Sequence, residues 1–201
     1  MYDDEFELTF DLSDEDEASR APEPEQEPVQ EAAPEPAAET EPPVEAVPEP
    51  AVPAANGRCV LISGGDRGIG AAAARAFWQA GYRVAVLYHT HAEAAAALEK
   101  ALPGLLAVQC DVASRASCEV AFHTVEQAVG HVDVLVSNAG IAQQKLFTDI
   151  TPEEWQHMLD VNLSGAFHLC QLALPGMIRR KAGRILTVSS MWGQTGGSCE
   201  V

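Results

Sequence analysis

The strongest constraint on the fold is the alternation of strand-length apolar runs with helical patterns from Gly57 onward. This alternation is typical of βαβ units, in which helices connect parallel strands. We expect the strands at 58–63, 82–88, 105–110, 132–137 and 184–189. The fold class is therefore α/β: a Rossmann-like, doubly wound parallel sheet, incomplete at about five strands.

Local signals define the helices between these strands. We expect helices over 68–80, 92–102, 114–130 and 151–174. Gly81 is a helix stop and Ser114 an N-cap. Thr151-Pro152-Glu153-Glu154 reads as a capping box with proline at the first helical position. The charge run 179–181 is expected in a solvated loop before the last strand.

The first 56 residues differ in composition from the rest. They hold 18 of the 30 acidic residues, one basic residue, 10 of the 13 prolines and no glycine, for a net charge of −17. Proline removes backbone donors and the glutamates repel one another, so residues 1–56 are expected to be a disordered acidic, Pro-rich tail before a domain at 57–201. Apolar residues alternate with carboxylates in 1–17, which fits either a docking segment for a protein partner or a solvating tail.

Composition also excludes several classes of protein. Neither part is basic enough for nucleic acid, and no apolar run is long enough to cross a membrane. The acidic start is unlike a signal peptide, so a cytoplasmic location is expected. Five separated cysteines without a CxxC pair suggest neither disulfides nor a zinc site. His89 and His91 have no third ligand nearby in sequence, so no metal is expected.

A glycine-rich turn, Ser63 to Gly70, separates the first strand from the first helix. Glycines at 64, 68 and 70 would let a diphosphate approach the unpaired N–H groups of the helix N-terminus. The turn lacks the lysine and hydroxyl residue of a P-loop. A structural turn without a ligand is the alternative.

Further polar segments follow the later strands. Asp111-Val112 follows the third, Ser137-Asn138-Ala139-Gly140 the fourth and Ser189-Ser190 the fifth, where open α/β sheets bind ligands. With SGGDRGIG, SNAG, DVNLSGAF and GRILTVSS, the chain resembles the short-chain dehydrogenase/reductase family over essentially all of 57–201. It is most similar to 3-oxoacyl-acyl-carrier-protein reductases. Two segments, 141–151 and 189–201, resemble elongation factor P 5-aminopentanone reductases.

The resemblance implies an NADPH-dependent carbonyl reductase acting on a small or carrier-bound ketone. Its implied cofactor-binding residues are Ser63, Gly64, Asp66, Arg67, Gly68, Ile69, Gly70, Asp111, Val112, Asn138, Ala139 and Gly140. Ser190 would hold the substrate carbonyl and Asn162 a proton-relaying water. The alternatives are a strand-end turn residue at 190 and, at 162, a satisfied polar residue that bends the long helix.

The second strand bears on the choice of cofactor. NAD enzymes place a carboxylate at its end for the ribose 2′-hydroxyl, where this chain has Tyr88-His89-Thr90. Arg67 offers a cation for a 2′-phosphate. NADP is therefore expected over NAD.

The family's Tyr-x-x-x-Lys motif would begin at about position 203, and the sequence ends at Val201. This chain is therefore expected to resemble a C-terminally truncated reductase that lacks its proton donor and is inactive alone. We also expect it to be poorly soluble, because its last strand is an unpaired edge of the sheet. A non-catalytic nucleotide-binding or partner-binding fragment is the contrasting hypothesis. The resemblance implies that full-length members of the family form homo-oligomers through the long helix and a neighbouring helix that this sequence does not contain, so no oligomeric state is assigned to the present chain.

Overall fold

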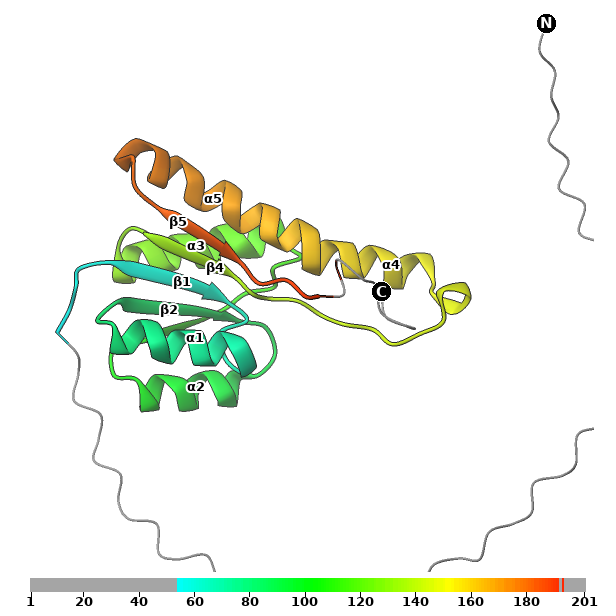
Figure 1. Cartoon of the computed structure of the whole chain (residues 1–201), viewed down its shortest axis with the longest axis horizontal. Helices are drawn as coiled ribbons and strands as arrows, with labels where there is room; N and C mark the ends of the chain where they lie inside the picture. The colour runs from blue at the N-terminus through cyan, green and yellow to red at the C-terminus, as the bar shows by residue number, and fades with distance from the viewer. Residues whose placement is uncertain (1–53, 192, 194–201) are drawn as a thin grey trace, which may run out of the picture. The chain divides into compact units, whose positions relative to one another are not determined.

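The computed structural model describes residues 54–191 and 193 and contains one parallel sheet (Figure 1). Its strand order is β3-β2-β1-β4-β5. The strands are β1 (Cys59–Ser63), β2 (Arg83–Tyr88), β3 (Leu106–Gln109), β4 (Val134–Ser137) and β5 (Arg184–Thr187). The α/β, Rossmann-like class expected from the sequence is confirmed.

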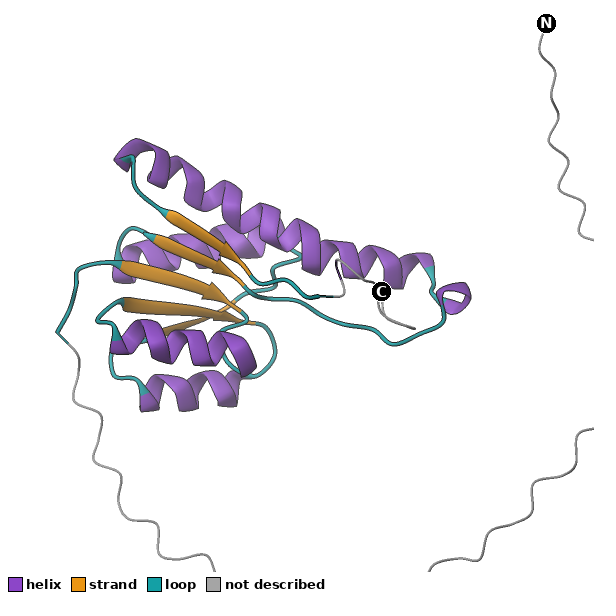
Figure 2. Ribbon diagram, in the orientation of Figure 1, coloured by secondary structure: helices purple, strands orange, loops and turns teal. Residues whose placement is uncertain are grey.

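Helices cover both faces of the sheet (Figure 2). Helices α1 (Gly68–Gln79) and α2 (Ala92–Ala101) pack on one face, and α3 (Arg115–Val129) and α5 (Gly165–Arg180) pack on the other. Alternate residues of each central strand enter the two cores. Leu61 and Leu135 face α3 and α5, whereas Val60 and Val136 face α1 and α2. Burial on both faces explains why these strands read as continuous apolar runs.

The long helix consists of three segments in succession: α4 (Pro152–Leu159), a π-helical turn η2 (Asp160–Ser164), and α5. A short 3₁₀ turn, η1 (Phe147–Asp149), precedes it. The capping box at its start is present, because the Thr151 hydroxyl accepts from the Glu154 N–H and the Glu154 carboxylate accepts from the Thr151 N–H. Ser114 caps α3 as expected.

Two expectations for the end of this helix are wrong. The helix continues past Leu174 to Arg180 and contains Pro175. Proline breaks a helical hydrogen bond, but Pro175 is exposed, and continuing the helix buries Met177 in the core. Arg180 is consequently helical, and its guanidinium donates to the Val132 carbonyl at 2.8 Å rather than standing free in a loop.

The start of the described part is hydrogen-bonded to the turn between α1 and β2. The Asn56 N–H donates to the Gly81 carbonyl and its side-chain amide to the Ala80 carbonyl. The proposed docking segment at 1–17 and nearly all of the acidic tail lie outside the described residues. None of the described helices is long and apolar enough to span a membrane.

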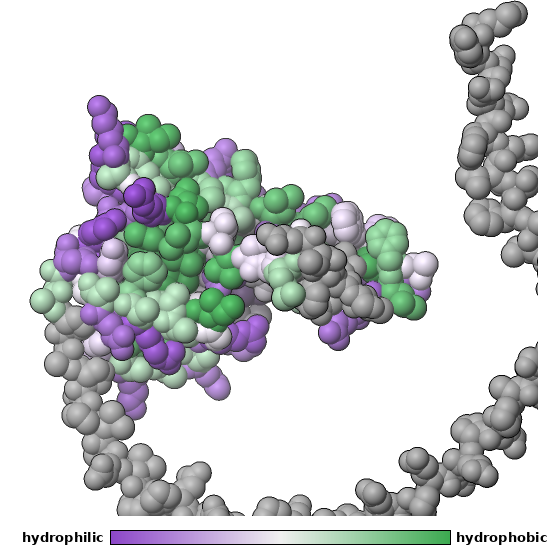
Figure 3. Space-filling view, in the orientation of Figure 1, coloured by the Kyte–Doolittle hydropathy of each residue, from purple (hydrophilic) through white to green (hydrophobic). Residues whose placement is uncertain are grey.

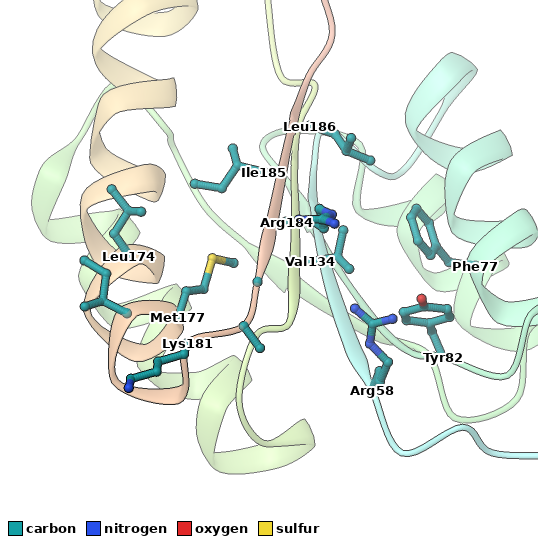
Figure 4. A pocket seen from close by; sticks show the side chains of 13 residues that line it. Arg58, Phe77, Tyr82, Val134, Leu174, Met177, Lys181, Arg184, Ile185 and Leu186 are labelled. Carbon is teal, nitrogen blue, oxygen red and sulfur yellow. The ribbon is translucent and has the colours of Figure 1, made fainter.

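An apolar groove of about 910 Å³ follows the edge strand β5. Figure 4 shows Ile185 on the same side of the strand as Leu174 and Met177, and Leu186 on the side of Phe77 and Tyr82. Hydrophobic residues gather over this part of the molecule in Figure 3. Leu186 is 48% exposed, so the edge presents apolar surface of the kind that promotes association.

The same substitution should therefore have different effects on stability at two adjacent residues of β5. Leu186→Glu should reduce aggregation and the binding of a hydrophobic dye, and change the unfolding free energy by only about 0.5 kcal/mol, because its side chain is half exposed. Ile185→Glu should cost about 2 kcal/mol or more, since its side chain packs against the core beneath α5. Light scattering and denaturant unfolding measure both effects. Equal destabilisation by the two substitutions would contradict the exposure of this edge.

Candidate functional site

A cleft of about 540 Å³ lies at the carboxyl ends of the strands. Its lining comes from the loops after β1, β2, β3 and β4, with two residues of the long helix, His157 and Val161. Strand β1 lies between β2 and β4. The chain therefore adds β2 and β3 on one side of β1, and β4 and β5 on the other. Ligands of doubly wound folds bind at such a switch point.

The glycine turn forms the floor of the cleft and leads into α1. Gly64 and Gly68 have φ angles of +60° and +52°, which side-chain-bearing residues rarely adopt. A Cβ atom on Gly70 would lie 2.1 Å from the Gly64 carbonyl oxygen, so only glycine allows the helix to start this close to the turn.

The N-terminus of α1 is suited to an anion. Its N-cap residue, Arg67, makes no side-chain cap, and no acidic residue occupies the first turn. A Cβ atom on Gly68 would meet nothing within 4 Å, so there is free space beside the unpaired N–H groups. Together with the glycine turn, this arrangement fits the diphosphate of a dinucleotide.

Ser63 and Asn138 join the ends of β1 and β4. The buried Ser63 hydroxyl accepts from the Asn138 and Ala139 N–H groups, each at 3.0 Å. The Asn138 amide donates back to the Ser63 and Gly64 carbonyls at 3.0 and 2.9 Å. These four bonds hold the loop after β4 against the glycine turn, so both residues act by shaping the cleft.

The segment after β3 is ordered by its own turn and by two thiols. The Asp111 carboxylate accepts from the Ala113 N–H, and the Ser117 hydroxyl accepts from the Asp111 N–H. Cys110 and Cys118 lie beneath, with their sulfur atoms 3.9 Å apart. The hydrogen bond between the two thiols holds the pKa of the Cys110 thiol below its ordinary value, although burial acts in the opposite direction.

Val112, which follows Asp111, is held by the long helix. A Cβ atom on Gly165 would lie 2.9 Å from a methyl group of Val112, and the His168 ring lies 3.1 Å from the Val112 carbonyl. The cleft wall formed by Asp111 and Val112 is thus fixed from both sides.

Charged and ring groups gather at the far end of the glycine turn. The Arg67 guanidinium lies 3.1 Å from His91 Nε2, and His91 Nδ1 lies 3.2 Å from the Thr90 hydroxyl. Because arginine only donates, the contact requires Nε2 to accept, and Nδ1 then carries the hydrogen. The Asp66 carboxylate is 3.6 Å from the same Nδ1.

The two residues implied in catalysis lie away from the cleft lining. Asn162 is in the π-helical turn, where its amide exchanges two hydrogen bonds with the Ile141 backbone, at 2.8 and 3.0 Å. This anchors the loop that follows Gly140. Ser190 is exposed and follows β5. The structure therefore places ten of the twelve expected cofactor residues in the lining of one cleft, and Ser63 and Gly70 outside the lining. Their part in cofactor binding, and the role of Ser190 and Asn162 in catalysis, stay predictions.

Sequence reasoning missed several residues of the lining. Cys110, Ile141 and His157 line the cleft. His91 does so as well, beside His89 of the segment that was expected at the adenosine ribose. His91 could have been assigned to the cleft because it follows the end of a strand. The place of His157 in the lining depends on how the long helix crosses the cleft, which the sequence does not indicate. Among the described residues no group of three His, Cys, Asp or Glu side chains could hold a metal ion.

The Ser63 hydroxyl gives a direct test of this frame. Ser63→Ala should lower the unfolding free energy by about 1 to 3 kcal/mol, because two N–H groups lose their acceptor. It should also weaken dinucleotide binding, measured by calorimetry, since the loop after β4 is released. Ser63→Thr keeps the hydroxyl and serves as the control. A stable, tightly binding alanine variant would show that these bonds do not hold the cleft.

Comparison with known proteins supports the same interpretation. The family model "short chain dehydrogenase" matches residues 58–201. The chain is 40% identical over 139 residues to an acetoacetyl-CoA reductase of Shinella zoogloeoides, covering 69% of this chain and 57% of that protein. It is also 40% identical over 144 residues to the 3-oxoacyl-[acyl-carrier-protein] reductase MabA of Mycobacterium avium, covering 70% and 53%.

This chain is also similar to a solved structure. The crystal structure of gox2181 aligns with a TM-score of 0.62 at 32% identity, covering 68% of this chain and 55% of that one. The chain spans about half the length of the curated relatives it matches. None of these relatives supports the narrower likeness to 5-aminopentanone reductases, which stays a prediction. On the matched motifs, the fold and the cleft, the chain belongs to the short-chain dehydrogenase family of NAD(P)-dependent oxidoreductases.

Proposed function

We propose that this chain forms the cofactor-binding part of an NADPH-dependent reductase of 3-oxoacyl thioesters. The observation that carries the proposal is the cleft at the switch point, where a glycine turn and an uncapped helix N-terminus meet the ends of four strands. The relatives named acetoacetyl-CoA reductase and 3-oxoacyl-[acyl-carrier-protein] reductase support the substrate class.

The residues of the cleft have separate tasks in this proposal. The turn from Gly64 to Gly70 and the first N–H groups of α1 bind the diphosphate. Asp111 and Val112 flank the adenine, and Arg67 pairs with a 2′-phosphate, for which its guanidinium is suited. When bound, the dinucleotide supplies a hydride to the substrate carbonyl.

Beyond the cofactor, Ser190 donates a hydrogen bond to the substrate carbonyl, and Asn162 holds the loop after Gly140 through Ile141. Neither tyrosine of the described residues lies at the end of β5, near Ser190. Tyr82 packs edge-on against Phe77, with ring centroids 5.0 Å apart, and Tyr88 lines the cleft at the end of β2, which β1 and β4 separate from β5. We therefore propose that the described residues bind cofactor and orient substrate without supplying a tyrosine proton donor.

This proposal predicts binding with slow turnover. The 201-residue chain should bind NADPH, which is detected as a change in the fluorescence of the nicotinamide. It should reduce acetoacetyl-CoA about 10²- to 10⁴-fold more slowly than a relative that has a general acid. A failure to bind any nicotinamide dinucleotide would contradict the proposed function. Turnover equal to that of such a relative would show that another group donates the proton. Reduction of a ketone on modified elongation factor P, with thioesters untouched, would favour the narrower alternative.

The long helix also carries an exposed apolar face. Leu163, Phe167 and Ile178 are 66%, 58% and 68% exposed, at spacings that place them along one side of the helix. We propose that a second copy of the chain packs on this face, as the family resemblance implies.

Phe167→Glu should accordingly shift the protein to a smaller species in analytical ultracentrifugation, because it buries a charge at the contact. Arg179→Ala, an exposed residue at the end of the same helix, should leave the assembly unchanged. An unaltered distribution for the Phe167 variant would show that this face is not an interface.

A further inference from the structure

The Asp66 carboxylate is the least satisfied charged group in the cleft. Its side chain is only 5% exposed, and its Oδ2 atom is buried without a hydrogen-bond partner among the described residues. A buried carboxylate oxygen that lacks a donor is costly in free energy, and such groups in native structures call for an explanation. A ligand donor at this position would remove the cost.

The position of Asp66 is held by its neighbours. The N–H of Gly65 donates to the Leu87 carbonyl of β2, and a Cβ atom on Gly65 would lie 2.6 Å from the Val86 side chain. Asp66 is therefore fixed beside the end of β2. It lines the cleft together with Tyr88, His89 and Thr90.

This is the region in which dinucleotide-binding folds recognise the adenosine ribose. An acidic residue at the end of the second strand normally accepts a hydrogen bond from the ribose 2′-hydroxyl of NAD. In this chain that strand ends at Tyr88 and is followed by His89, but the Asp66 carboxylate of the glycine turn lies 3.6 Å from His91 in the loop after the strand. The half-exposed His91 ring, 46% exposed and 3.6 Å away, is the group that a ligand would displace to reach Oδ2.

Arg67, the next residue, has the opposite preference. Its guanidinium is at the cleft and contacts His91 Nε2, so it can pair with a 2′-phosphate that replaces the ring. A carboxylate and a guanidinium thus contact the two nitrogens of one ring at the cleft. The carboxylate favours a ribose hydroxyl and repels a phosphate, and the guanidinium attracts a phosphate.

We infer that Asp66 is a specificity-determining residue that accepts a hydrogen bond from the adenosine ribose 2′-hydroxyl, so that the protein binds NAD(H) as well as NADP(H). Arg67 sets the competing preference for the 2′-phosphate, and the pair keeps the discrimination between the two cofactors small. The inference rests on the proposed function only in that a nicotinamide dinucleotide occupies the cleft.

The test compares the dissociation constants of NADH and NADPH, measured by calorimetry on the 201-residue chain and on two variants at one ionic strength. The wild type should bind NADH within about tenfold of NADPH. Asp66→Asn removes the charge at constant shape and should raise the ratio of the NADH to the NADPH constant by about tenfold. Arg67→Gln should lower that ratio by about tenfold, because the phosphate loses its cation.

Using a ratio separates recognition from folding, since a general loss of structure weakens both cofactors equally. Asp149→Asn, at an exposed position in η1, is the control and should leave the ratio unchanged. An equal loss for both cofactors in the Asp66 variant, or a greater loss for NADPH, would overturn the inference. A wild type that binds NADPH alone would also overturn it and leave the proposed function standing, whereas one that binds neither would contradict both.

Discussion

The hydrogen bonds between Ser63 and the loop after β4 are the interaction on which the cleft depends. Strands β1 and β4 are neighbours in the sheet although their paired residues, such as Val60 and Val134, are 74 positions apart in the sequence. At the carboxyl end, the Ser63 hydroxyl and the Asn138 amide close this pair. At the other end, the Asp133 carboxylate accepts from the Cys59 N–H at 2.9 Å. The switch point is thus secured on both sides, and the glycine turn is placed relative to β4 rather than left as a loose loop.

Much of this arrangement could be predicted from the sequence because the relevant signals are local. The apolar runs indicated the five strands, most clearly β1, β2 and β4, which are buried on both faces and are therefore largely apolar. The capping box at Thr151 and the cap at Ser114 act within one helical turn, so their sequence pattern is sufficient. The spacing of the glycines indicated a phosphate-binding turn, since close backbone approach requires that residue type.

The parts that could not be predicted depend on contacts between distant segments. Arg180 looked like part of a solvated charge run, but its partner, the Val132 carbonyl, lies 48 residues earlier and is presented only when α5 packs on the sheet. The helix passes Pro175 because tertiary burial of Met177 outweighs a local breaking signal. The absence of a carboxylate at the end of β2 suggested NADP, yet Asp66 reaches that place from a turn 22 residues before Tyr88, which only the fold reveals.

The π-helical turn links the two halves of the site. Its Asn162 amide is bonded to Ile141 after β4, and the next turn presses Gly165 against Val112 after β3. A π-helical turn is uncommon and is often found at functional sites, because the extra residue reorients side chains without ending the helix. Here it aims Asn162 at one rim of the cleft while its successor contacts the other. The opposite side of the same segment carries the exposed Leu163 and Phe167. A copy of the chain packed on that side would therefore order the helical turns that shape both rims, so assembly and cofactor binding would act on the same residues.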